Sequence, residues 1–209
     1  MAALNVKPTR MELSNLKKKR KVAVRGHKLM KDKRDEMVRR FIVYVRRNRT
    51  LREEVEQKLA SAMQGFVLAR ASMRAEAVEE ALCYPARPAE IKVSAQHVLS
   101  VVVPKLELAS VGKVELPYGI VGPSAELDAA VQAFAELLPL LIELAEVEKT
   151  CNRLADEIEK TRRRVNALEY VMIPQFDEAI RTIKMKLDEN ERGNLTRLMK
   201  TKEMLAQKE

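Results

Sequence analysis

The sequence predicts a mostly α-helical protein, a long antiparallel two-helix coiled coil with a small β-hairpin head between its arms. Three observations lead to this fold class. Of the 209 residues only 4% are aromatic, 33% are charged and six are Gly, a composition typical of long helices rather than of sheet domains. No proline occurs between Pro8 and Pro85. Apolar residues also recur at heptad spacing in both halves of the chain.

The first arm is predicted for residues 1–84. Thr9 follows Pro8 and stands three positions before Glu12, which is the pattern of a capping box at a helix start. Because no proline interrupts the segment before Pro85, one helix of roughly 70 residues can follow, on the order of 100 Å long. So long a helix needs a partner helix. Its expected contact row, called the seam here, is apolar at every seventh position: Leu16, Ala23, Met30, Met37, Tyr44 and Leu51.

A second heptad row on the same helix is half polar, so we expect a coiled coil with costly polar interruptions. His27 in this row is interpreted as a packed polar residue, because neither it nor His97 has Cys or paired carboxylates at ligand spacing. Apolar Val22, Leu29, Val38 and Ile42 lie beside the seam and would suit a further packing neighbour. The row itself contains Leu13, Arg20, His27, Arg34, Phe41, Asn48 and Val55.

The small head is predicted for residues 85–123. Residues 91–93, 98–103 and 106–108 are rich in β-branched and apolar residues, which favours a short hairpin over a domain with its own large core.

The second arm is predicted for residues 124–209, with Pro139 breaking or kinking it to give a short helix followed by a long one. Its apolar spacing is a regular alternation of three and four until the step from Met172 to Phe176, which is four where three is due. Pro174 lies at this slip and is expected to bend the helix. The predicted seam residues of this arm include Cys151, Leu154, Ile158, Val165, Leu168 and Met172.

The positive charge is concentrated at the start of the chain. Residues 1–50 hold 17 Lys and Arg against 4 Asp and Glu, whereas residues 51–149 have a net charge of −6 and residues 150–209 one of +2. Such asymmetry is common in proteins that bind nucleic acid or acidic membrane surfaces, although a solvated basic helix face would look the same. No secretion signal or membrane-spanning apolar run is evident, so we expect a cytoplasmic protein with reduced thiols.

Motifs of catalysis are absent from the sequence. It has no Gly-rich phosphate loop and no zinc-protease motif, and we predict no catalytic residue, no cofactor and no metal. The carboxylates of Glu143, Glu146 and Glu148 are interpreted as a solvated face, and Cys151 as a packing residue. From these features alone the chain could be a structural component, a basic coiled coil that binds nucleic acid or acts as a scaffold, or a peripheral membrane tether.

Two stretches carry a family resemblance. Residues 5–37, with PTRMEL and RGHKLMKDKRDE, and residues 144–174, with RRRVNALEY, resemble the D subunit of the V/A-type rotary ATPases, the central stalk of these complexes. Residues 123–128 and 134–141 are similar as well.

The resemblance implies a rotor shaft that couples ATP hydrolysis or synthesis to rotation and ion transport. It implies that both termini enter a catalytic hexamer of A and B subunits, that a small F subunit binds alongside, and that the far end meets a socket subunit above the membrane ring. Active sites would lie on other subunits, and the chain would be cytoplasmic and peripheral to the membrane. We expect five basic residues on outer faces to contact the hexamer or the F subunit: Arg25, Lys28, Arg162, Arg163 and Arg164.

Overall fold

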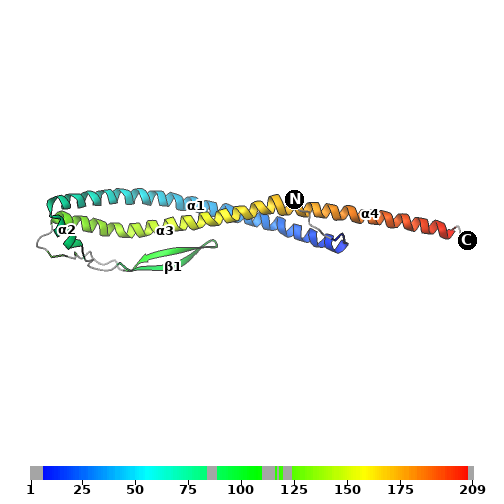
Figure 1. The fold of residues 1–209 in the computed structure, drawn as a ribbon, viewed down its shortest axis with the longest axis horizontal. Helices are drawn as coiled ribbons and strands as arrows, with labels where there is room; N and C mark the ends of the chain where they lie inside the picture. The colour runs from blue at the N-terminus through cyan, green and yellow to red at the C-terminus, as the bar shows by residue number, and fades with distance from the viewer. Residues whose placement is uncertain (1–6, 84–88, 110–115, 117, 120–123, 207–209) are drawn as a thin grey trace. The chain divides into compact units, whose positions relative to one another are not determined.

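A computed structural model describes residues 7–83, 89–109, 116, 118–119 and 124–206. It confirms the predicted fold class: long helices precede and follow one antiparallel β-hairpin in the chain, and the hairpin lies beside α3 (Figure 1). The chain forms two compact units: a terminal unit of Met1–Glu36 with Ile158–Glu209, and a central unit of Met37–Glu157. The elements in chain order are α1 (Arg10–Ser72), α2 (Ala75–Leu82), β1 (Ile91–Val98), β2 (Val101–Leu108), α3 (Ala125–Ala167), η1 (Leu168–Met172) and α4 (Ile173–Ala206).

Helix α1 begins with Thr9 as its predicted N-cap, but the Thr9 backbone N–H donates to the Lys7 carbonyl at 2.9 Å, so only half of the predicted capping box is confirmed. The Glu12 backbone N–H donates to Thr9 Oγ1 at 3.2 Å, so the threonine satisfies one of the N–H groups that the first helical turn leaves unpaired. The helix then continues for 63 residues to Ser72, and the short helix α2 follows. The predicted boundaries of the head fall on residues 84, 85 and 123, which lie outside the described residues.

In the central unit, α1 and α3 run antiparallel. The Ser72 hydroxyl donates to Glu126 Oε2 at 2.8 Å, where α1 ends and α3 starts, and Arg47 forms an ion pair with Glu143 further along. The start of α3 is capped by Ser124, whose Oγ accepts from the Leu127 N–H at 3.3 Å. Small and branched side chains fill the space between the helices, and those fully or nearly fully buried include Val55, Ala62, Ala69, Ala130, Leu137 and Leu154.

Pro139 does not break the second arm, so the predicted short helix before a long one was wrong. Helix α3 is continuous over 43 residues with Pro139 inside it. The ring removes one helix hydrogen bond, and Pro139 itself is exposed. Burial of Leu137 and Ile142 on either side of the proline stabilises the helix across this position.

The hairpin lies against α3 in the central unit. Its strands pair from Ile91↔Leu108 to Val98↔Val101, so the predicted β-prone run at 98–103 is split by a two-residue turn at Leu99 and Ser100. Leu99 has a φ of 59°, a region that is costly for a residue with a Cβ. Buried Val98, Val101 and Val103 lie at the turn end of the hairpin. A hydrogen bond from the Leu106 N–H to Glu146 Oε2 at 2.8 Å joins the hairpin to the helix.

In the terminal unit, the first part of α1 pairs with the end of α3, η1 and α4. Leu16 and Ala23 are buried on α1, and on the opposite helix Val165 of α3 and Ile183 of α4 are buried. Segment η1 is a π-helix in which the Ile173 N–H bonds to the Leu168 carbonyl, a wider turn that holds one extra residue.

The π-helix explains why one predicted seam residue is misplaced. Met172 is 42% exposed, whereas Leu168 and Ile173 are half-buried. The seam therefore takes a step of five residues across η1 and then continues through Phe176 with its usual alternation. Because the sequence pattern assumes a constant number of residues per turn, it placed the slip one step too late.

Candidate partner-contact surfaces

The five basic residues proposed for partner contacts are all exposed and all lie in the terminal unit. Arg25 and Lys28 lie on α1, and the three consecutive arginines lie near the end of α3. Arg163 forms an ion pair with Glu159 one turn earlier on the same helix. Because they are exposed, these side chains are available to a partner, and their role in partner contacts stays a prediction.

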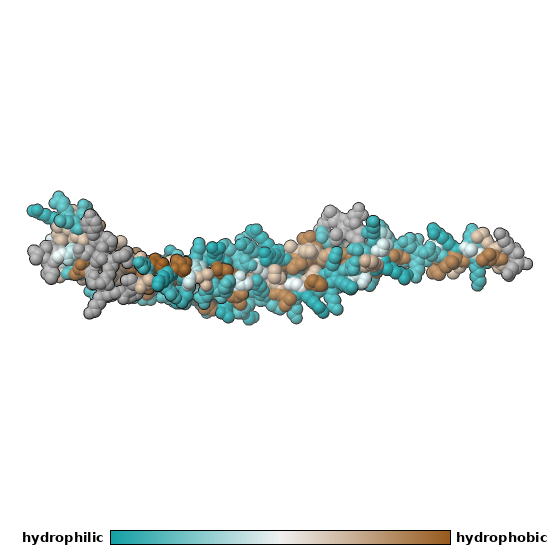
Figure 2. All heavy atoms as spheres, turned by 90° about the horizontal axis from the view of Figure 1, so that it is seen from below, coloured by the Kyte–Doolittle hydropathy of each residue, from teal (hydrophilic) through white to brown (hydrophobic). Residues whose placement is uncertain are grey.

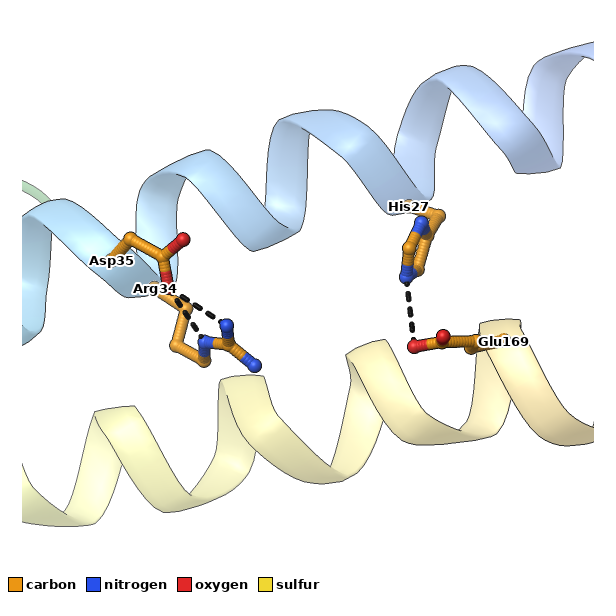
Figure 3. A network of polar contacts seen from close by, with 4 residues as sticks. All are labelled: His27, Arg34, Asp35 and Glu169. Carbon is orange, nitrogen blue, oxygen red and sulfur yellow. Dashed lines mark hydrogen bonds and ion pairs between the residues drawn. The ribbon is translucent and has the colours of Figure 1, made fainter.

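Two polar interruptions of the α1 seam are paired across the helices. Arg20 Nε lies 2.5 Å from Asp177 Oδ1. His27 Nε2 lies 3.2 Å from Glu169 Oε2, as Figure 3 shows. Both pairs are partly exposed, so each contributes little to stability. Each pair nevertheless joins polar groups of the two helices at facing positions, and polar residues of this kind fix the register of a coiled coil.

Arg34, the next polar residue of this row, is neutralised within its own helix. Its Nε and Nη2 both donate to Asp35 Oδ1, at 3.0 and 2.7 Å (Figure 3). The sequence reasoning missed the carboxylates of Glu169 and Asp177. From the sequence alone these carboxylates are eight residues apart, which does not match the seven residues between Arg20 and His27 on α1, so a constant heptad register gave no signal for the pairs.

Cys151 is buried between α1 and α3 in the central unit. Burial raises the pKa of its thiol, a hydrogen bond from the Asn48 side chain opposes that shift, and the nearby Glu148 carboxylate adds to it. A thiol held in its neutral form is a poor nucleophile and metal ligand. The other described cysteine, Cys83, is exposed.

Two carboxylates that the sequence assigned to a solvated face take part in the fold. Glu143 pairs with Arg47, and Glu146 accepts the hydrogen bond from β2. A third carboxylate, that of Asp128, accepts from the Tyr118 hydroxyl at 2.8 Å. Burial, followed by this hydrogen bond, raises the pKa of Tyr118 to about 12. Glu143 thus joins α3 to α1, while Glu146 and Asp128 join β2 and Tyr118 to α3.

Apolar side chains are exposed along the long helices, in groups between hydrophilic surface (Figure 2). They include Val22, Leu29 and Ile42 beside the α1 seam, as the sequence indicated. Contiguous exposed apolar surface is uncommon on monomeric proteins and marks contact surfaces. The C-terminal helix α4 carries a further set: Met185, Leu195, Leu198, Met199, Met204 and Leu205.

Among the residues that the structure describes, no three His, Cys, Asp or Glu side chains form a group that could hold a metal ion. The described helices also include none with the length and apolar character needed to cross a membrane. The features that do stand out are long paired helices with exposed basic and apolar side chains. They define a class of coiled-coil protein that acts through contacts with other proteins.

Comparison with known proteins identifies the family. A sequence model of the ATP synthase D subunit matches residues 12–203. The chain is 54% identical to the D subunit of the V-type ATP synthase of Thermoanaerobacter sp. (strain X514) over 206 residues, which is 98% of this chain and 99% of that protein. The D subunit of Acetivibrio thermocellus is 53% identical over 98% of this chain and 94% of its own length. That of Clostridium botulinum (strain Langeland) is 52% identical, with 99% and 97% covered.

The chain belongs to the D-subunit family of ATP synthases. The match spans both long helical regions and the hairpin between them. None of these comparisons supports the alternative of a nucleic-acid-binding protein.

Proposed function

We propose that the chain is the central shaft of a V-type rotary ATPase or ATP synthase and has no catalytic residues of its own. The observation that carries this proposal is the near full-length match to the D subunit of V-type ATP synthases, in a chain built on two long antiparallel helical segments. A helical pair of this kind presents outer faces to other proteins along its length and encloses little core of its own.

The partners we propose are a hexamer of A and B subunits around the terminal unit, a small F subunit alongside, and a socket subunit that links the shaft to the membrane ring. ATP would be hydrolysed or made on the A and B subunits. An asymmetric shaft inside the ring would make the catalytic sites unequal and would couple their chemistry to rotation and ion transport. In this arrangement the chain is cytoplasmic and peripheral to the membrane.

Charge supports the placement of the terminal unit in the ring. Residues 1–36 hold 12 Lys and Arg against 4 Asp and Glu, and residues 158–209 hold 12 against 9. This unit therefore has a net charge of +11, which disfavours a bare helical pair through self-repulsion. A ring with acidic or carbonyl-rich inner surface would offset that repulsion, and the five exposed basic residues would contact it.

The test is assembly of the complex. We expect the full chain to co-purify with the A, B and F subunits, and to be required for ATP hydrolysis that is coupled to ion transport. The isolated chain should bind no ATP in calorimetry. A coupled complex that assembles without this chain, or stoichiometric ATP binding by the chain alone, would contradict the proposal.

A further inference from the structure

The π-helical turn η1 (Leu168–Met172) inserts one residue into an otherwise regular pairing of two helices. The seam step from Leu168 to Ile173 is five residues, and the steps beyond it return to three and four. Pro174 follows directly and cannot donate the hydrogen bond that an α-helix would need at that position. The seam spacing and Pro174 thus both favour a wide turn at this position.

The effect of this insertion is confined to the turn itself. On one side of the turn His27 pairs with Glu169, and on the other Arg20 pairs with Asp177. These pairs are seven residues apart on α1 and eight apart on the opposite helix, from η1 to α4. Since one extra residue lies between two matched pairs, the helices keep one register on both sides. The insertion therefore does not serve to shift α4 along α1.

What the turn does change is the surface. It presents three consecutive large apolar side chains to solvent: Tyr170 is 68% exposed, Val171 49% and Met172 42%. Four residues lie between the seam positions Leu168 and Ile173, whereas without the insertion three residues would lie between these two positions. The extra residue thus enlarges an outward-facing apolar surface where the chain could have kept a plain α-helix. π-Turns inside α-helices are frequent at functional sites.

Helix α1 exposes apolar side chains at the same level of the pair. Val22 is 68% exposed and Val24 43%, and both lie between the α1 positions of the two ion pairs. Successive α-helical residues are about 100° apart, so these two valines face opposite flanks of the Ala23 seam position. Together with the turn they place exposed apolar side chains on both helices at one level, beside exposed Lys21 and Arg25. A partner on one side could cover only part of this surface.

We propose that η1, with Val22 and Val24, forms an apolar collar that contacts the inner surface of the ring of subunits around the shaft. The inference rests on the proposed function and adds the site of contact and its chemistry. Exposed Arg162 and Arg164 precede the turn by one to two helical turns. The surface that fits the collar is therefore apolar with an acidic or carbonyl-rich border.

The test compares two variants of the full chain with the wild type. The double substitution Y170Q and M172Q keeps the turn and helix-forming residues but removes apolar surface. Deletion of Val171 shortens the spacing from Glu169 to Asp177 to seven residues, which allows a continuous α-helix with both ion pairs kept. The matched control is V67Q with L68Q, two exposed apolar residues of the central unit.

We expect all variants to keep the helicity of the wild type, and the deletion variant to be at least as stable to heat. Binding to purified A and B subunits should weaken about tenfold or more in both collar variants, the effect of losing an apolar anchor, and should be unchanged in the control. If either collar variant folds and binds the ring as tightly as the wild type, the collar is not a ring contact. Loss of binding to anionic vesicles with ring binding unchanged would also overturn the proposal, in favour of a membrane contact.

The two proposals fail in different ways. If the wild-type chain itself does not bind A and B subunits, the proposed function is wrong and the collar falls with it. If the wild type binds and the collar variants bind equally, only the collar is wrong.

Discussion

The two described cysteines differ in environment and so should differ in reactivity. Cys83 is exposed, whereas Cys151 is buried with the pKa of its thiol raised by burial. Because the thiolate is the reacting form, we expect a thiol reagent at neutral pH to modify Cys83 rapidly and Cys151 only after unfolding. Counting modified thiols over time in native and denatured protein measures this. The variant Cys83→Ser should lose the rapid phase, and a rapid phase that survives in it would contradict the predicted burial of Cys151.

Tyr118 offers a test at alkaline pH. Burial and its hydrogen bond to Asp128 raise the tyrosine pKa to about 12 from an ordinary 10.0. Because the pKa of Tyr118 is higher in the folded than in the unfolded protein, this tyrosine stabilises the fold fully below pH about 10. That contribution is lost as the pH rises toward about 12. Phenolate absorbance should therefore show a tyrosine in the wild type that ionises near pH 12, and the variant Tyr118→Phe should lack it.

The control for this titration is Asp128→Asn, which keeps a hydrogen-bond acceptor but removes the charge. We expect its last tyrosine to ionise at a lower pH than in the wild type. A titration curve that is the same in wild type and both variants would show that Tyr118 is not held as the structure describes.

At the scale of elements, the hairpin turn carries local strain. Leu99 has a φ of 59°, where a residue with a Cβ costs roughly 1–2 kcal/mol. Replacement by Gly should relieve this cost and increase the protection of β1 and β2 amides from hydrogen exchange. Leu99→Ala is the matched control, because it removes the side chain but keeps the Cβ. Equal protection in the Gly and Ala variants would mean that the turn is not strained at this residue.

Much of the helical pairing could be predicted from the sequence because heptad spacing reports directly which face of a helix is buried. Leu16, Ala23 and Met37 on α1 and Leu154 and Val165 on α3 are all buried in the structure. The prediction for Met172 failed because a heptad count assumes constant residues per turn, and only the hydrogen bond from Ile173 to Leu168 reveals the wider one.

Other features depend on contacts between distant parts of the chain, which local patterns do not contain. Pro139 was expected to break or kink the helix, but α3 continues through it, with buried Leu137 and Ile142 on either side. To predict that Glu169 pairs with His27 and Asp177 with Arg20, the register of the two helices must be known. The one-residue insertion between these carboxylates conceals that register in the sequence. The five basic residues were foreseeable as surface groups, and all five are exposed.

For the whole molecule, the proposed contact of the basic residues with the ring predicts an effect of salt. Replacement of Arg162, Arg163 and Arg164 together by Gln keeps helix-forming residues and removes three exposed positive charges. We expect normal helicity of the free chain, weaker assembly with A and B subunits, and lower coupling of ATPase activity. In the wild type, assembly should weaken as salt rises, because salt screens exposed charges.

The matched control replaces Arg70, Arg74 and Arg153, exposed residues of the central unit, by Gln, which removes the same charge outside the terminal unit. If the triple variant and this control assemble like the wild type at every salt concentration, the arginines are solvated and replaceable, each worth no more than about 0–1 kcal/mol as an exposed group.

Rotation of the chain inside the ring is the central claim, and it can be observed directly. Exposed Cys83 can carry a probe while Cys151 is buried. The probe is attached in an assembled complex whose A and B subunits are fixed to a surface and whose other exposed cysteines have been replaced. We predict that the probe turns in one direction in steps when ATP is added. ATP hydrolysis by a complex that contains the labelled chain while the probe stays still would contradict it.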